Sequence, residues 1–209
     1  MNSLAFFLRN KLKENRFSDA VLTALNMSSI DSALLCSGFF QEDASYSVTA
    51  SRFSSIMRCC HPLKLTTVGY YAHGKTSYTA FVGGIKKHCC QHCVKHTPLR
   101  MPGNKWHAKV FIGKALGEPV VAAIGSSNMT RRAFDTVKSF NYECDVLIWD
   151  EQNTLVSSQV AAILGEAPDE RLSVIVAQVD KNHPVNRIPV AAKLKKLERE
   201  ILAKAVRFE

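Results

Sequence analysis

The sequence contains no apolar run that approaches the roughly 20 residues needed to cross a bilayer. Its N-terminal stretch, MNSLAFFLRNKLKE, has only five consecutive apolar residues and no small-residue cleavage pattern, so a secretory signal is not expected. The seven cysteines are odd in number, and Cys59–Cys60 and Cys89–Cys90 are adjacent pairs. Small secreted domains have an even, spaced cysteine framework instead. We therefore expect a cytoplasmic protein with reduced thiols and no membrane partner.

Acidic residues are missing from a long central part of the chain. No Asp or Glu occurs between Asp43 and Glu118, whereas this stretch contains eleven Lys and Arg residues, and the net charge of the chain is +9. Unpaired like charges repel one another, so a basic segment of this length favours a polyanionic partner. We expect nucleic acid, with DNA favoured over RNA, and anionic lipid headgroups are the main alternative.

The pattern along the chain alternates predicted strands and helices, without an internal repeat or a long linker. Such an order predicts an α/β sandwich with a central mixed β-sheet flanked by helices, formed by a single domain over residues 1–209. The C-terminal helix, at about 188–206, is predicted to serve for packing or as an interface. Helices are predicted at 3–25, 47–58, 78–92, 154–164 and 190–205, and strands at 32–40 (closing on Gly38), 65–71, 106–112, 119–124, 144–149 and 172–179. Pro98, Pro102 and Gly103 predict a loop.

Two segments carry residues suited to phosphoryl transfer. His107 and Lys109 are two positions apart on a predicted strand, so both side chains point to the same face. The next predicted strand ends in a polar turn, Gly125-Ser126-Ser127-Asn128. If the two strands are neighbours, the turn brings hydroxyl, amide and backbone N–H groups near a histidine that can attack phosphorus.

This H-x-K and G-S-x-N pattern resembles the motif of the phospholipase D superfamily, in particular its nuclease-like branch. Downstream, Glu143 begins an apolar strand, as a family glutamate does. The resemblance implies a phospholipase D-like sandwich and a phosphodiesterase that acts through a covalent phosphohistidine, without a metal or other cofactor. One position departs from the pattern: Lys114 stands where the family often has an aspartate.

The resemblance also implies a role for each residue of the motif. His107 would attack the phosphodiester, while Lys109 and Asn128 would hold the non-bridging oxygens and Ser126 would add a hydrogen bond. Glu143 would fix the tautomer of the histidine. Each residue has an ordinary explanation by itself, such as an edge-strand lysine or a helix-capping asparagine. Their occurrence together in this order favours one active site.

Further residues are candidates for substrate binding. Arg131 and Arg132 directly follow the polar turn and are predicted to contact phosphates, and Ser127 could substitute for the neighbouring serine hydroxyl. Lys75, in the loop after the second predicted strand, could meet another phosphate.

A cluster of histidines and cysteines leaves open a zinc site. If residues 78–92 and their continuation form one helix, His88 and His92 share a face and Cys89 and Cys93 share a neighbouring one. The spacing lacks the usual zinc-knuckle pattern, so a basic helix with partly buried thiols is favoured over a metal site.

The favoured function is therefore a metal-independent DNA endonuclease. A lipid phosphodiesterase or phosphatidyltransferase is the alternative enzyme, and a catalytically silent nucleic-acid-binding subunit is the alternative from another class. Because the mechanism needs two histidines and the chain has one motif, we expect a homodimer that brings two copies of His107 to one shared active site.

Overall fold

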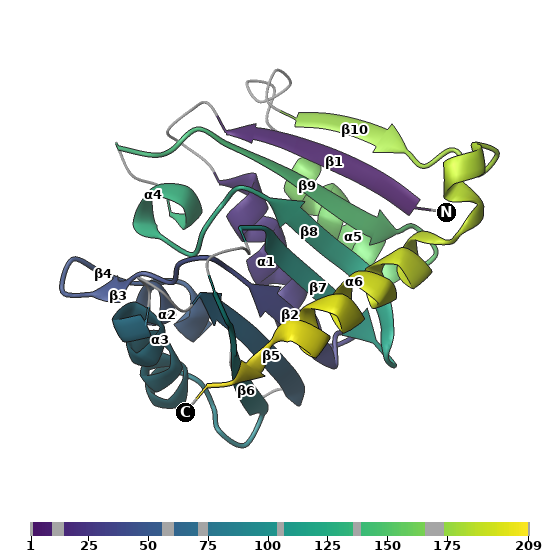
Figure 1. Cartoon of the computed structure of the whole chain (residues 1–209). Coiled ribbons are helices and arrows are strands. Elements are labelled where there is room, and N and C mark those ends of the chain that lie inside the picture. Colours follow the sequence, from purple (N-terminus) through teal and green to yellow (C-terminus); the bar gives the residue numbers. More distant parts are fainter. Residues whose placement is uncertain are drawn as a thin grey trace.

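The computed structural model of the chain describes residues 2–9, 15–55, 61–70, 75–103, 107–135, 139–165 and 174–208 (Figure 1). Within these residues the main strands are β1 (Asn2–Arg9), β2 (Ser32–Cys36), β5 (Leu63–Tyr70), β6 (Val94–Met101), β7 (Lys109–Ala115), β8 (Glu118–Gly125), β9 (Glu143–Asp150), β10 (Val174–Gln178) and β11 (Val206–Arg207). They form a mixed sheet in the order β10-β1-β9-β8-β7-β2-β5-β6-β11. The pairs β2–β5 and β5–β6 are parallel and the other neighbours are antiparallel.

Helices cover both faces of this sheet. They are α1 (Arg16–Asn26), α2 (Val48–Ser51), α3 (Lys75–His88), α4 (Arg131–Phe134), α5 (Thr154–Leu164) and α6 (Val190–Lys204), with short 3-10 turns at Phe53–Ser55 and Pro184–Arg187. A small hairpin is formed by β3 (Glu42–Asp43) and β4 (Tyr46–Ser47). Figure 1 shows α6 crossing one face of the sheet, while α1 and α5 lie against the other. The predicted α/β architecture with a central mixed sheet is thus confirmed.

Strand alternation divides the core into two layers. In β7, Phe111 points to the layer that contains α1, α3 and α5, whereas Val110 and Ile112 point to the layer beneath α6. Leu194 and Ile201 are the buried residues of α6 and complete the second layer. Both faces of the central strands are therefore apolar, as expected for a sheet between helices.

The first predicted helix is wrong in its N-terminal half. Residues 2–9 form strand β1, and only Arg16–Asn26 is helical. The run Leu4, Phe6, Leu8 alternates with buried residues on the opposite face, which is the period of a strand. Because almost every residue in this run is apolar, it fits the helical spacing equally well. Pairing with β9 on one side and β10 on the other decides for the strand.

The segment around Pro98 also differs from the prediction. Helix α3 ends at His88, and the predicted loop around Pro98 is strand β6. The proline is accommodated because the two-residue strand β11 pairs only beside it, with Leu99 and Arg100, and the proline carbonyl still accepts from Phe208 N.

Two of the remaining helices were predicted closely and one was not. The helix at 154–164 is confirmed and the C-terminal helix ends one residue earlier than predicted. The helix predicted at 47–58 is only one turn, α2, followed by a 3-10 turn, and its last residues lie outside the described part. No helix in the described part of the chain has the length and apolar character to cross a membrane.

Candidate active site

The residues of the predicted motif meet at one edge of the sheet. Lys109 at the start of β7 pairs with Gly125 at the end of β8, which in turn pairs with Asp145 near the start of β9. Glu143 is the first residue of β9, and His107 precedes β7 by two residues. The two predicted strands are therefore neighbours, and this register brings the polar turn next to the histidine and lysine.

His107 and Lys109 are in direct contact. The imidazole Nδ1 lies 3.2 Å from the ammonium Nζ, and because an ammonium group can only donate, Nδ1 accepts in this arrangement. The histidine is exposed and the lysine is 3% exposed. Burial lowers the pKa of Lys109, while the negative charges of Glu143 and Asp145 oppose that shift.

The side chain of Asn128 is held by a turn that follows β2. Its Oδ1 accepts from Phe39 N at 3.1 Å and from Ser37 Oγ at 3.3 Å. The amide NH2 is left as the group that can donate to a phosphate oxygen. A Cβ at Gly38 would lie 3.2 Å from Asn128 Oδ1, so a glycine suits this close approach. Sequence analysis placed a strand end at Gly38 but did not connect it with the site.

Ser126 and Glu143 are joined by a short hydrogen bond. The exposed Ser126 hydroxyl donates to Glu143 Oε2 and accepts from Cys144 N at 3.0 Å. Asn141 Nδ2 donates to Glu143 Oε1 at 3.2 Å. Among the described residues, the hydrogen bonds of Glu143 go to this serine and asparagine, and none joins it to His107. The expected histidine–glutamate pair is thus not formed in this arrangement, although both side chains belong to the same edge.

Ser127 faces inward. Its backbone N–H donates to Asp145 Oδ1 at 3.1 Å and its hydroxyl donates to Asp145 Oδ2 at 2.6 Å. Both residues are 1% exposed. The Ser127 hydroxyl is therefore engaged inside the protein and Ser126 is the serine of this turn that faces solvent, so the suggested substitution of one hydroxyl for the other is not supported.

Arg131 and Arg132 begin α4 and line a cleft beside the polar turn. The helix is capped by Thr130, whose hydroxyl accepts from Ala133 N, and Gln41 Oε1 accepts from Arg131 N at 3.0 Å. Both arginines are exposed. The cleft has a volume of about 990 Å³ and is lined by Phe39, Gln41, Asp43, Ser45, Thr130, Arg131, Arg132, Ser139 and Asn141.

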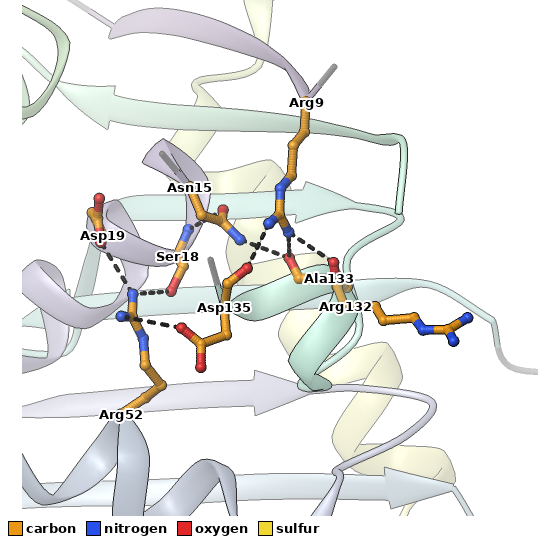
Figure 2. A network of polar contacts seen from close by, with 8 residues as sticks. All are labelled: Arg9, Asn15, Ser18, Asp19, Arg52, Arg132, Ala133 and Asp135. Carbon is orange, nitrogen blue, oxygen red and sulfur yellow. Dashed lines mark hydrogen bonds and ion pairs between the residues drawn. The ribbon is translucent and has the colours of Figure 1, made fainter. Parts of the chain in front are cut away.

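Arg9, at the end of β1, anchors the segment that carries these arginines (Figure 2). Its guanidinium donates to the carbonyl oxygens of Arg132, Ala133 and Asp135. Arg52 in turn bonds to α1 and contacts the carboxylate of Asp135. Sequence analysis missed Arg9 because it was placed within a helix, where no pattern connects it to residues more than a hundred positions away.

Lys75 was predicted to bind a phosphate from a loop. Lys75 is exposed and is the first residue of α3, not part of a loop; the strand that precedes it in the sequence, β5, ends at the same sheet edge as the site.

The helix assumed for the zinc hypothesis is wrong, since α3 ends at His88 and Cys89, His92 and Cys93 lie in the turn before β6. Within the described residues, no group of three or more His, Cys, Asp or Glu side chains is arranged to hold a metal ion.

Comparison with known proteins supports the fold. No protein-family model and no curated protein matches the sequence. Among solved structures, phosphatidylserine synthase from Haemophilus influenzae Rd KW20 matches with a TM-score of 0.50 and 12% identity, covering 98% of this chain and 48% of that one. Yeast tyrosyl-DNA phosphodiesterase matches with a TM-score of 0.36 and 14% identity, over 69% of this chain and 31% of that one. Polyphosphate kinase from Porphyromonas gingivalis matches with a TM-score of 0.43 and 11% identity, over 82% and 27%.

These neighbours are members of the phospholipase D superfamily, and the chain spans about half of their length or less. At such low identity the likeness shows the fold alone, and it is the match to the synthase that carries it. The chain therefore has a phospholipase D-like fold, as the motif predicted.

Proposed function

We propose that the protein is a metal-independent phosphodiesterase that cleaves nucleic acid, most readily DNA, through a covalent phosphohistidine. The observation that carries this proposal is the meeting of His107, Lys109, Ser126, Asn128 and Glu143 at one edge of the sheet. A nucleophile, a buried cation and neutral donors in one place suit attack on phosphorus and stabilisation of the charge that develops on its oxygens.

The reaction proceeds in two displacements. His107 Nε2 attacks phosphorus, an N–P bond forms, the P–O bond to the leaving group breaks, and a second histidine protonates the leaving oxygen. Water then attacks phosphorus while the second histidine, now neutral, takes its proton, and the N–P bond breaks to return neutral His107 and the phosphate product. Lys109 and the Asn128 NH2 group hold the non-bridging oxygens in both steps.

Attack through Nε2 requires the proton to be on Nδ1. Without substrate, His107 Nδ1 accepts a hydrogen bond from Lys109 Nζ. When the ammonium group turns to the substrate phosphate, Nδ1 can take up the proton and donate instead. We propose that His107 Nδ1–H then donates to the carboxylate of Glu143, which gives up its hydrogen bond with Ser126.

The distribution of charge supports a polyanionic substrate. Of the basic residues in the acid-free segment, Lys114 pairs with Glu198, and Arg52 pairs with Asp19 and Asp135, so acids from elsewhere neutralise these two. Among the described residues of the segment, five lysines are exposed: Lys64, Lys75, Lys86, Lys87 and Lys95. Lys64 and Lys95 are in register with Ser32, at the end of the sheet opposite to the candidate site, so the exposed charge favours a polyanionic partner in general and does not trace a path for it.

We also propose that two copies of the chain share one active site, because the mechanism needs a second histidine. His96 does not suit that role: it lies within hydrogen-bond distance of Thr67, and burial lowers its pKa to about 4. A second copy would supply its own His107, as a two-fold axis at the sheet edge allows.

An apolar strip at the same end of the outer strands is a candidate contact surface for this assembly. Leu8, Cys144 and Ile175 are exposed on the face of β1, β9 and β10 that points away from α1 and α5. Helix α6 packs on the same face at β8, which leaves the outer strands to a second copy. Leu8 is in register with Cys144, and both lie on the opposite face of the sheet from Glu143 and Asp145, so a partner seated here would meet the candidate active site only around the ends of β1 and β9.

The function is tested by incubation with plasmid DNA, single-stranded DNA, RNA and phosphatidylcholine vesicles, each in excess EDTA and each repeated with His107→Ala. Cleavage of nucleic acid by the wild type alone is expected, with affinity that falls steeply as salt is added. Cleavage of the phospholipid alone would support the lipid enzyme. Activity that requires magnesium would contradict the mechanism, and DNA binding without cleavage would indicate a silent binding subunit.

The shared site is tested by mixing wild-type and His107→Ala chains under conditions in which subunits exchange. Activity should fall as the square of the wild-type fraction, because only wild-type dimers hold both histidines. A linear fall, or full activity in a demonstrated monomer, would mean that the second proton donor comes from the same chain.

A further inference from the structure

The site contains a buried carboxylate that belongs to no part of the predicted motif. Asp145 on β9 is in register with Gly125 on β8, which is in register with Lys109 on β7. Registered positions on neighbouring strands share a face of the sheet. The strands that bear Lys109 and Asp145 are about 10 Å apart. Because the glycine between them has no side chain, none separates Lys109 from Asp145.

The carboxylate occupies the space above the glycine. A Cβ at Gly125 would lie 1.9 Å from Asp145 Oδ1 and 2.7 Å from Asp145 Cα, so no other residue fits there without displacing the acid. The glycine of the polar turn therefore makes room for Asp145, and the negative charge lies between the strand that bears Lys109 and the strand that bears Glu143.

The same carboxylate holds the polar turn. Its two oxygens accept from the backbone N–H and the hydroxyl of Ser127, at 3.1 and 2.6 Å. Ser127 lies between Ser126 and Asn128, the two residues proposed to meet the phosphate. Both bonds restrain the turn that presents these donors, and neither depends on the substrate.

Burial of a carboxylate in this position costs stability, because its charged form loses the hydration it has in water. Asp145 is 1% exposed, and no ion pair joins it directly to a basic side chain in the described part of the chain. Burial raises its pKa to about 6, against the hydrogen bonds from Ser127. The charged groups around it are Lys109 on β7, Arg9 on β1 and Glu143 on its own strand. Buried ionisable groups held at such a cost cluster at functional sites.

We propose that Asp145 is a positioning residue, which holds the polar turn through Ser127 and supplies, together with Glu143, the negative charge that keeps the buried Lys109 an ammonium ion before phosphate binds. Burial alone favours a neutral amine, and a neutral amine cannot offset the charge on a phosphate oxygen. This assignment rests on the proposed function in one respect, namely that Lys109 is the cation that meets the substrate.

The test compares Asp145→Asn with a matched control. Asparagine keeps the shape and can still bond to Ser127, but it removes the charge. The control is Asp31→Asn, at the opposite end of the sheet, because Asp31 also accepts from a serine hydroxyl, that of Ser32 at 2.8 Å, and from a backbone N–H, that of Leu116 at 2.6 Å.

In Asp145→Asn, we expect kcat to fall about tenfold or more and the alkaline limb of its pH profile to move to lower pH by about one unit, since Lys109 loses a nearby negative charge. Asp31→Asn should leave both unchanged. Ser127→Ala, which keeps the charge and removes one hydrogen bond, should lower kcat without moving the alkaline limb. An alkaline limb that stays in place in Asp145→Asn would overturn the assignment.

An NMR titration of the Lys109 side chain separates this proposal from the proposed function. The Cε resonance, assigned with Lys109→Arg, should titrate at lower pH in Asp145→Asn than in the wild type, whether or not the protein cleaves a phosphodiester. An inactive wild type with this shift would refute the function and retain the charge coupling. Equal titration in both proteins would refute the role of Asp145 itself.

Discussion

Two neighbouring rows on the same face of β7, β8 and β9 have opposite character. Phe111, Ala123 and Leu147 are in register and form an apolar row that is buried against the helices. Two residues along each strand, Lys109, Gly125 and Asp145 form a polar row. Burial of the apolar row stabilises the fold, whereas burial of the charged groups in the polar row destabilises it. Substitutions in the apolar row should therefore lower stability, and substitutions in or next to the polar row should lower activity.

The largest expected effect is on activity, just outside the polar row. His107→Ala removes the nucleophile, so kcat/KM should fall by about 10³-fold or more. Because this side chain is exposed, its free energy of unfolding should change by less than about 0.5 kcal/mol. Parallel measurements of nuclease activity and chemical denaturation check both parts, and a large loss of stability would show that the histidine has a structural role.

A substitution in the apolar row should do the reverse. Phe111→Ala leaves a cavity against the helices, and we expect the free energy of unfolding to fall by about 3–5 kcal/mol. Turnover by the fraction that remains folded should stay close to that of the wild type. Urea denaturation and active-site-normalised rates measure the two effects, and loss of turnover in fully folded protein would contradict the separation of the rows.

Lys109→Ala and Asn128→Ala should reduce kcat by about 10²–10³-fold and change substrate affinity much less. Both groups act on charge that is greatest in the transition state, whereas binding is spread over many basic residues. Single-turnover rates together with equilibrium DNA binding separate the two quantities. A variant that binds poorly but turns over normally at saturation would be incompatible with these roles.

The smallest expected effect is a gain in stability. The pKa of Asp145 is raised from the usual 3.8 to about 6, so the native state binds this proton more tightly than the unfolded chain does. The stability due to this group is therefore full below about pH 4 and is lost as the pH rises through 6. At pH 7, Asp145→Asn should be more stable than the wild type by up to about 3 kcal/mol. Denaturation curves between pH 4 and 7.5 should show this difference shrinking toward acid, and a difference independent of pH would exclude Asp145 as the titrating group.

The local sequence pattern predicted the wrong secondary structure for two outer strands, β1 and β6. β1 was predicted as a helix because a run of almost entirely apolar residues satisfies both periods, and β6 was predicted as a loop because of Pro98. In both cases pairing with strands distant in the sequence decided the outcome. Arg9 was missed with its strand, and with it the bonds that anchor the segment carrying Arg132.

The sequence by itself determined the sheet-and-helix architecture and identified the residues of the candidate site, because alternating apolar segments and the spacing of His107, Lys109 and the polar turn are local features. Only the tertiary structure decided which residues surround them. The turn at Ser37–Phe39, Arg9 and Asp145 reach the site through sheet register and chain reversal, and these join residues far apart in the sequence, as in the pairing of Arg9 with Glu143 and of Phe7 with Asp145. Asp145 is the one acid inside β9, which begins with Glu143 and ends with Asp150, and no pattern in the chain distinguishes it from a residue exposed to solvent. Its burial over Gly125 depends on three strands lying in one register, which the free energy of the whole sheet selects.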